Sequence, residues 1–148
     1  MEENTEIEII EIIISSIDLY SIEKVKQLRN AARPKISQGD LSRRLDLADG
    51  FVSKVESYKQ PSRYNLQQLN KLVKIFHLNS YQDFFGNEII PEDLLKVRVE
   101  IKKSKVWNPK TKKFRSERAA TILRKTPLNE KEFELWKNND LKYLTFIQ

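Results

Sequence analysis

Residues 36–56 read ISQGDLSRRLDLADGFVSKVE, and this stretch predicts two short amphipathic helices joined by a tight turn. In the first helix Leu41 and Leu45 stand four residues apart, so they share one face. In the second helix Val52 and Val55 stand three residues apart on another face. Two such helices bury little apolar surface alone, so the fold requires further helices against these four side chains.

Polar residues mark the start of the first helix and the turn between the two. Ser37 and Asp40 have the Ser-x-x-Asp spacing of a capping box, in which the hydroxyl accepts from a backbone N–H and the carboxylate reaches back. Four residues between the apolar faces suit a turn and a helix start: Asp46, Ala48, Asp49 and Gly50.

This order of residues resembles the helix-turn-helix of the Cro/phage-repressor family, also called the xenobiotic-response-element family. The family pattern is roughly Leu-Arg, a gap, Ser/Thr-Gln-x-x-Leu-Ala, a hydrophobe, a turn and x-x-Ile-Ser-x-Ile-Glu. The matching positions are Leu28-Arg29, Ser37-Gln38, Leu41-Ser42, Leu45, Val52-Ser53-Lys54-Val55-Glu56, Lys59 and Pro61-Ser62. The resemblance covers about residues 22–86.

The sequence departs from the family pattern at three positions. Ser42 replaces the small Ala where the two helices cross, and Asp46 replaces the usual turn Gly. Ser is also small, and Asp tolerates left-handed backbone better than most residues, so both fit the motif. Tyr58 stands where the family often has Gly, and we expect the loop there to differ.

The resemblance implies a mainly α chain with a five-helix repressor-like DNA-binding domain over residues 21–86. We expect an acidic, Ile-rich N-terminal extension over residues 1–20 and a small basic α+β module over residues 87–148. The implied function is a sequence-specific, double-stranded-DNA-binding transcriptional regulator, a repressor that acts as a homodimer.

In the resembling family the second helix enters the major groove and its exposed side chains reach base edges. The positions carried over as base contacts are Asp49, Gly50, Phe51, Ser53 and Lys54. Lys54 can donate to guanine or to a phosphate, and Asp49 can accept from cytosine or cap the helix, which is the interpretation we favour. Phe51 can touch a thymine methyl or pack against its neighbours.

The family's phosphate contacts come from the first helix and from the loop after the second. The positions carried over are Ser37, Gln38, Arg43, Lys59, Arg63 and Tyr64. A helix N-terminus offers free N–H groups and a positive dipole end, which suits the phosphate expected at Gln38. Glu56 resembles the family's structural glutamate, and we expect it to form a salt bridge or a loop hydrogen bond.

Composition excludes several classes of protein. The chain has no Cys and one His, so disulfides, thiolate metal sites and multi-His metal sites are excluded. No paired-carboxylate motif with a nearby His stands out, so we expect no enzyme, no metal and no cofactor. The N-terminus lacks a basic secretory start and no apolar run is long enough to span a bilayer, so we expect a cytoplasmic protein without a membrane partner.

Charge is divided unevenly along the chain. The net charge is +6 with a pI near 9.4, which permits a polyanionic partner. Residues 1–20 carry acidic side chains and no Lys or Arg, whereas residues 96–125 carry twelve basic side chains against Glu100 and Glu117.

The Ile-rich stretch of residues 5–14 fits either a strand or a helix face, as a core element or as a dimerisation element.

Residues beyond 87 leave more than one interpretation open. Alternating apolar and basic residues over 95–102, then Asn108-Pro109-Lys110, predict a basic β-hairpin with Trp107 and Phe114 near its tip. Basic residues beside aromatics can bind nucleic acid, but a solvated sheet face has the same pattern. We also expect helices over 118–125 and 130–137 and a last strand over 141–147. The alternative function is an antitoxin-type interaction protein whose residues 87–148 bind a partner protein.

Overall fold

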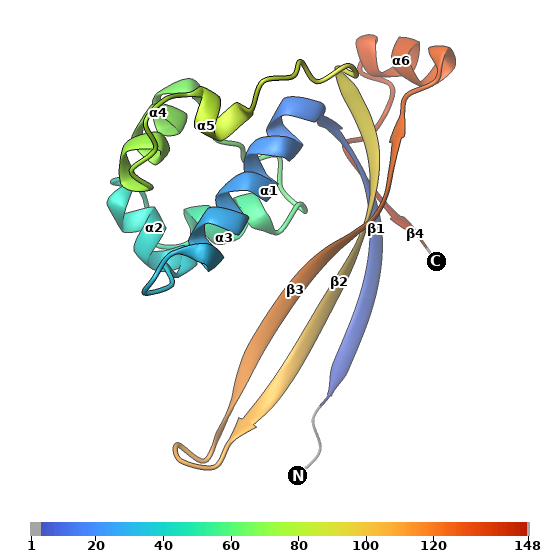
Figure 1. Ribbon diagram of the computed structural model, residues 1–148. Coiled ribbons are helices and arrows are strands. Elements are labelled where there is room, and N and C mark those ends of the chain that lie inside the picture. Colours follow the sequence, from blue (N-terminus) through green and yellow to red (C-terminus); the bar gives the residue numbers. More distant parts are fainter. Residues whose placement is uncertain (1–3, 148) are drawn as a thin grey trace. The chain divides into compact units, whose positions relative to one another are not determined.

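A computed structural model of the chain describes residues 4–147 (Figure 1). These residues form two compact units. One, called here the helical unit, spans Ile14–Asp93, and the other, the sheet unit, combines the residues up to Ile13 with those from Leu94 onward. The helical unit is therefore inserted in the sequence between two strands of the sheet unit.

The helical unit consists of short helices around an apolar core. They are α1 (Ser16–Ala31), α2 (Gln38–Arg44), α3 (Phe51–Glu56), α4 (Leu66–Ile75) and α5 (Gln82–Phe85). The apolar pairs that predicted α2 and α3, Leu41 with Leu45 and Val52 with Val55, are almost completely buried. Phe84 of α5 is completely buried as well and closes this core.

Helix α1 begins earlier than the sequence pattern predicts. Ser21 stands before Val25 and Leu28, which share a helix face, so the sequence predicts a cap at Ser21 and a helix from Ile22. The hydroxyl of Ser15 instead accepts from the backbone N–H of Asp18 at 3.2 Å and caps the helix there. Ser21 lies inside the helix and donates to the carbonyl of Ile17 at 2.8 Å. The strand that precedes α1 thus ends in its cap, a connection that apolar spacing alone does not reveal.

The sheet unit is a four-stranded antiparallel sheet with one helix. Its elements are β1 (Thr5–Ser15), β2 (Leu94–Asn108), β3 (Lys113–Pro127), α6 (Glu130–Lys137) and β4 (Leu144–Ile147), and the strand order is β3-β2-β1-β4. The hairpin predicted at Asn108-Pro109-Lys110 and the helix predicted over 130–137 are confirmed. The last strand is shorter than expected.

The helix predicted over residues 118–125 is wrong, because these residues belong to β3. They pair with β2 in a ladder that runs from Asn108 opposite Lys113 to Leu95 opposite Pro127. The alanines and leucine of the segment favour a helix locally, but the ladder satisfies the backbone N–H and C=O groups of a whole strand at once. Tertiary pairing therefore overrides local propensity here.

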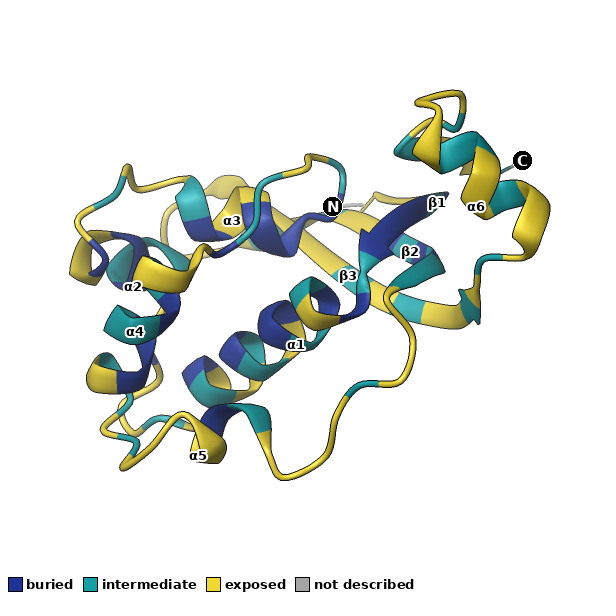
Figure 2. Cartoon of the chain, turned by 90° about the horizontal axis from the view of Figure 1, so that it is seen from above, coloured by how far each residue is buried: buried dark blue, intermediate teal, exposed yellow. Residues whose placement is uncertain are grey.

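The Ile-rich stretch near the N-terminus is a strand, which resolves the strand-or-helix question. Strand β1 lies between β2 and β4, and the backbone N–H of Lys105 on β2 donates to the carbonyl of Asn4 at 3.0 Å. Ile12, Ile13 and Ile14 are consecutive and all buried, and Figure 2 shows a dark blue, buried stretch of β1. Since neighbouring side chains on a strand point to opposite faces, both faces of β1 are buried at this end.

These strands overturn the expected fold class. The chain is 31% strand and 35% helix, so it is an α+β fold with a four-stranded antiparallel sheet, and not a mainly α chain built on a five-helix domain. The prediction failed because β1 and β3 contain residues that the local sequence patterns assign to an extension and to a helix. Only pairing between strands distant in sequence makes them parts of one sheet.

Candidate nucleic-acid interface

The start of α2 is fixed by Ser37. Its hydroxyl accepts from the backbone N–H of Asp40 at 3.1 Å, which is the first half of the expected capping box. The carboxylate of Asp40 lies 3.1 Å from the guanidinium of Arg44, one turn further on. Asp40 therefore acts along the helix surface, where such exposed pairs contribute only about 0.3–0.5 kcal/mol.

Ser42 joins α2 to the beginning of α3. It is completely buried, and its hydroxyl donates to the carbonyl of Gln38 at 2.9 Å and accepts from the backbone N–H of Val52 at 3.0 Å. The N-cap residue of α3 is Gly50, which has no side chain to offer. The serine at the helix crossing thus supplies from α2 the cap that α3 lacks.

The turn between the helices has the geometry expected of its Asp. Asp46 has a φ of 61°, in the left-handed region, which is the backbone geometry that an Asp tolerates better than most residues. The N–H of Leu47 donates to the carbonyl of Ser42 at 2.9 Å, which closes the C-terminal end of α2. Tyr58, where the family often has Gly, is also left-handed with a φ of 62° and is buried.

A buried ion pair ties α3 to α1. The guanidinium of Arg29 donates to both carboxylate oxygens of Glu56, at 3.0 and 2.6 Å, and to the carbonyl of Ile36 at 3.0 Å. The side chains of Arg29 and Glu56 are only 6% and 3% exposed. The salt bridge expected at Glu56 is confirmed, and its partner Arg29 was visible in the sequence only as part of a motif.

Gln38 belongs to the same network. Its side-chain amide donates to Oε1 of Glu56 at 3.1 Å. The amide is therefore anchored by protein in the described structure, at the first turn of α2. The phosphate contact assigned to Gln38 stays a prediction.

The first turn of α3 presents most of the predicted base-contact positions at the surface. Asp49, Gly50, Ser53 and Lys54 are exposed, and Phe51 is half-buried, with its ring centroid 6.0 Å from that of Tyr64. The cap interpretation of Asp49 is wrong, because α3 begins after Gly50 and the carboxylate of Asp49 lies 3.5 Å from the guanidinium of Arg43.

The predicted phosphate-contact positions fall into different environments. The side chain of Arg43 is 59% exposed, and Ser37 is exposed at the start of α2. Lys59 and Arg63 are half-buried, and Nη1 of Arg63 donates to the carbonyls of Gln60 at 3.0 Å and Ser62 at 2.7 Å. Arg63 therefore stabilises its own loop.

Tyr64 requires a correction. Its side chain is 5% exposed, so the hydroxyl does not reach the surface where a phosphate would bind. The hydroxyl has no hydrogen-bond partner within the described residues. Burial, with a smaller contribution from the nearby Glu56 carboxylate, raises the pKa of Tyr64 well above its usual range. Tyr64 is part of the core beside α3.

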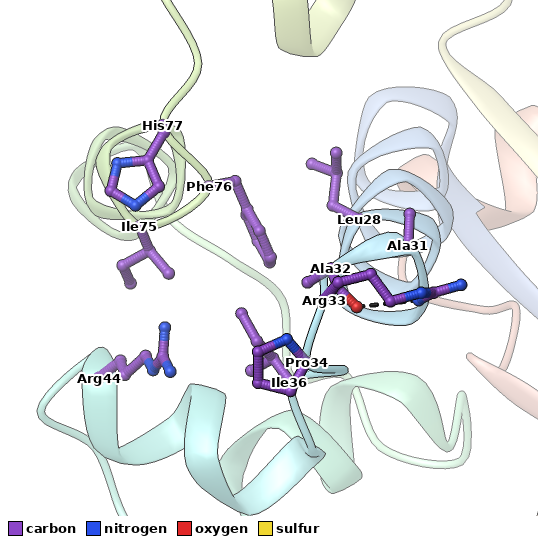
Figure 3. Close-up of a pocket in the computed structure, with 10 residues that line it drawn as sticks. All are labelled: Leu28, Ala31, Ala32, Arg33, Pro34, Ile36, Arg44, Ile75, Phe76 and His77. Carbon is purple, nitrogen blue, oxygen red and sulfur yellow. Dashed lines mark hydrogen bonds between the residues drawn. The ribbon is translucent and has the colours of Figure 1, made fainter.

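A hollow of about 420 Å³ lies elsewhere on the helical unit, between the ends of α1, α2 and α4 (Figure 3). Its walls are mainly apolar, including Leu28, Pro34 and Phe76, and Arg44 and His77 also line it. None of the five predicted base-contact positions lines it. The exposed face of α3 and this hollow are therefore separate surfaces.

Within residues 4–147 no group of three or more His, Cys, Asp or Glu side chains is arranged to hold a metal ion. No helix in the same range is both long and apolar enough to cross a membrane. No known protein family, curated protein or solved structure matches the chain significantly.

Proposed function

We propose that this chain is a sequence-specific, double-stranded-DNA-binding transcriptional regulator that reads the major groove with α3. The observation that carries the proposal is the clamp around α3, in which Ser42 and the Arg29–Glu56 pair hold the helix from its inner side. The clamp leaves Ser53 and Lys54 exposed on the outer side. Rigid support for an exposed polar helix face is what base readout needs.

The residue roles follow from chemistry at the surface of α3. Lys54 donates to guanine O6 or N7, and Ser53 donates to or accepts from a neighbouring base edge. Gly50 permits close approach of the backbone, while Arg43, Ser37 and Gln38 contact phosphates, which position the protein without reading sequence. No catalytic step and no cofactor are part of this function.

The proposed assembly is a homodimer that represses transcription in the cytoplasm, the compartment where such a regulator would meet DNA. Two copies of α3 would then lie about 34 Å apart and read a nearly palindromic site. Sedimentation of the protein with a selected site tests the stoichiometry, and one chain per site would contradict the dimer.

The experiment that tests the function is selection from a random duplex library, followed by binding of the selected site and of a scrambled site. The variant Ser53→Ala with Lys54→Ala should lower the ratio of specific to non-specific affinity by about 30-fold or more, since it removes two base contacts that contribute about 1–3 kcal/mol of discrimination each. The matched control is Gln67→Ala with Lys74→Ala, which removes the same charge from exposed positions of α4.

Equal specificity ratios for the two double variants would refute the assignment of α3 as the recognition helix. Failure of the wild-type chain to enrich any sequence would refute the proposed function itself. If a second protein then co-purified in stoichiometric amount with the full chain, the interaction-protein alternative would take its place.

A further inference from the structure

The distal half of the β2–β3 hairpin concentrates positive charge. Residues 102–118, called here the arm, contain eight Lys or Arg and a single Glu, Glu117. Every residue from 108 to 118 is exposed, whereas Val97, Val99 and Ile101 on the proximal half of β2 are completely buried. The hairpin therefore changes from a core element to a charged, solvated ribbon at about Ile101.

The arm is an ordered ribbon with a defined tip. At a rise of roughly 3.3 Å per residue, the part of β2 from Lys102 to Asn108 extends about 20 Å. The side chain of Asn108 accepts from the N–H of Lys110 at 2.9 Å, and the N–H of Lys112 donates to the carbonyl of Asn108 at 2.8 Å. Trp107 and Phe114 pair across the strands edge to face, with centroids 5.1 Å apart.

The charges of the arm are poorly neutralised by the protein. Nζ of Lys102 lies 3.7 Å from Oε1 of Glu100, and the guanidinium of Arg115 pairs with the carboxylate of Glu117. The other cations of the arm have no carboxylate partner among the described residues. Lys103 lies directly opposite Arg118 in the ladder, and like charges in that position are destabilising. A bound polyanion would relieve this repulsion.

The cations lie on both faces of the ribbon. Side chains alternate along a strand, so Lys103, Lys105 and Arg118 share one face. By the same register, Lys102, Lys113 and Arg115 share the opposite face. A ribbon with positive charge on both faces is complementary to a groove that has phosphates along both walls, and the major groove admits a two-stranded ribbon.

We propose that the arm binds the phosphate backbone of duplex DNA, with the ribbon lying in the major groove. The aromatic pair favours a duplex over single-stranded nucleic acid, because each ring packs against the other in place of a base. The inference extends the proposed function by adding a sequence-independent contact from the sheet unit. The arm and α3 are tested by different measurements, so either can fail alone.

The test measures binding of the full chain to a mixed-sequence duplex at several salt concentrations. The variant Lys105→Gln/Lys110→Gln/Lys113→Gln removes three exposed arm charges that have no carboxylate partner within the described residues. Its plot of log affinity against log salt should become shallower by about 2.7, because each phosphate that a lysine neutralises contributes about 0.9 to the slope. The corresponding Lys→Arg triple variant keeps the charges and should retain the wild-type slope.

A matched control removes the same net charge from the same unit. Lys131→Gln/Lys137→Gln/Lys142→Gln changes exposed lysines outside the arm, and its slope should equal that of the wild type. Circular dichroism spectra identical to wild type show that each triple variant is folded. Equal slopes for the arm variant and the wild type, or an equal decrease in the control, would overturn the proposal.

Other polyanions are compared in the same assay format. If the arm variant loses affinity for single-stranded DNA or for vesicles of anionic lipid but not for duplex DNA, the proposed occupant is wrong. The helix-turn-helix proposal fails in a different measurement. If it is wrong, the α3 variant keeps the wild-type specificity ratio, while the salt slope of the arm variant still becomes shallower.

Discussion

The buried Arg29–Glu56 pair gives the sharpest prediction for stability. Arg29→Met leaves the carboxylate of Glu56 buried, with the Gln38 amide donating to it at 3.1 Å. Removing one partner of a buried, doubly hydrogen-bonded pair costs about 3–5 kcal/mol, because the remaining charge stays desolvated and uncompensated. Glu56→Leu should cost a similar amount, because the buried guanidinium of Arg29 loses its carboxylate partner and keeps the carbonyl of Ile36 as an acceptor.

The double variant Arg29→Met/Glu56→Leu should be more stable than either single variant. It removes both charges and keeps apolar volume, so the loss should fall to about 1–2 kcal/mol, which corresponds to the orphaned Ile36 carbonyl and Gln38 amide. Urea unfolding measures the three free energies, and circular dichroism at the helical band follows mainly the helical unit, which contains all the described helices except α6. Trp107 and Trp136 both belong to the sheet unit, so tryptophan fluorescence reports separately on that unit.

The reasoning would be refuted if the single variants were destabilised by less than about 1 kcal/mol, the range of exposed pairs. It would also be refuted if the destabilisation of the double variant equalled the sum for the two single variants, because additivity means that the groups do not interact.

Two further predictions concern a hydroxyl and a carboxylate. Tyr64→Phe should leave DNA affinity unchanged and alter the free energy of unfolding by about 0–1 kcal/mol, since it removes a buried hydroxyl that has no partner among the described residues. A large loss of DNA affinity would instead support the phosphate contact predicted at Tyr64. The hydrogen bond from Lys96, and then that from the Asn129 backbone, lower the pKa of Glu132. A carboxylate whose pKa is lower in the folded state than in the unfolded state stabilises the fold at pH values above the unfolded-state pKa. This stabilisation is lost as the pH falls through the folded-state pKa. Glu132→Gln should therefore destabilise the protein at neutral pH and lose this effect in acid, whereas a pH-independent difference in urea midpoint would contradict the assignment.

Predictions from the sequence succeeded where the responsible interactions are local. Apolar spacing located α2 and α3, Ser37 capped the first of them, and Asp46 took the left-handed turn. Asn65 stands directly before the apolar stripe of α4, which predicts a cap there, and it forms a capping box with Gln68. Each of these features depends on residues within one or two turns of chain.

The predictions failed where the deciding partner is distant in sequence. Ser15 caps α1 only because β1 ends at that residue. Residues 118–125 are a strand because β2 is available to pair with them. Tyr64 was placed on the phosphate backbone by analogy of position, but packing around α3 buries it. The role of Ser42 in capping α3 could have been suspected, since a buried hydroxyl at a helix crossing needs a partner.

The sequence by itself determined the local elements of the helical unit and the separation of acidic and basic segments, because spacing, caps and charge are properties of neighbouring residues. Only the tertiary structure decided that the Ile-rich N-terminal stretch is a strand, that the chain is α+β, and that Arg29 meets Glu56. Those outcomes depend on which buried backbone and charged groups find partners across long stretches of chain, because a buried polar group without a partner costs free energy.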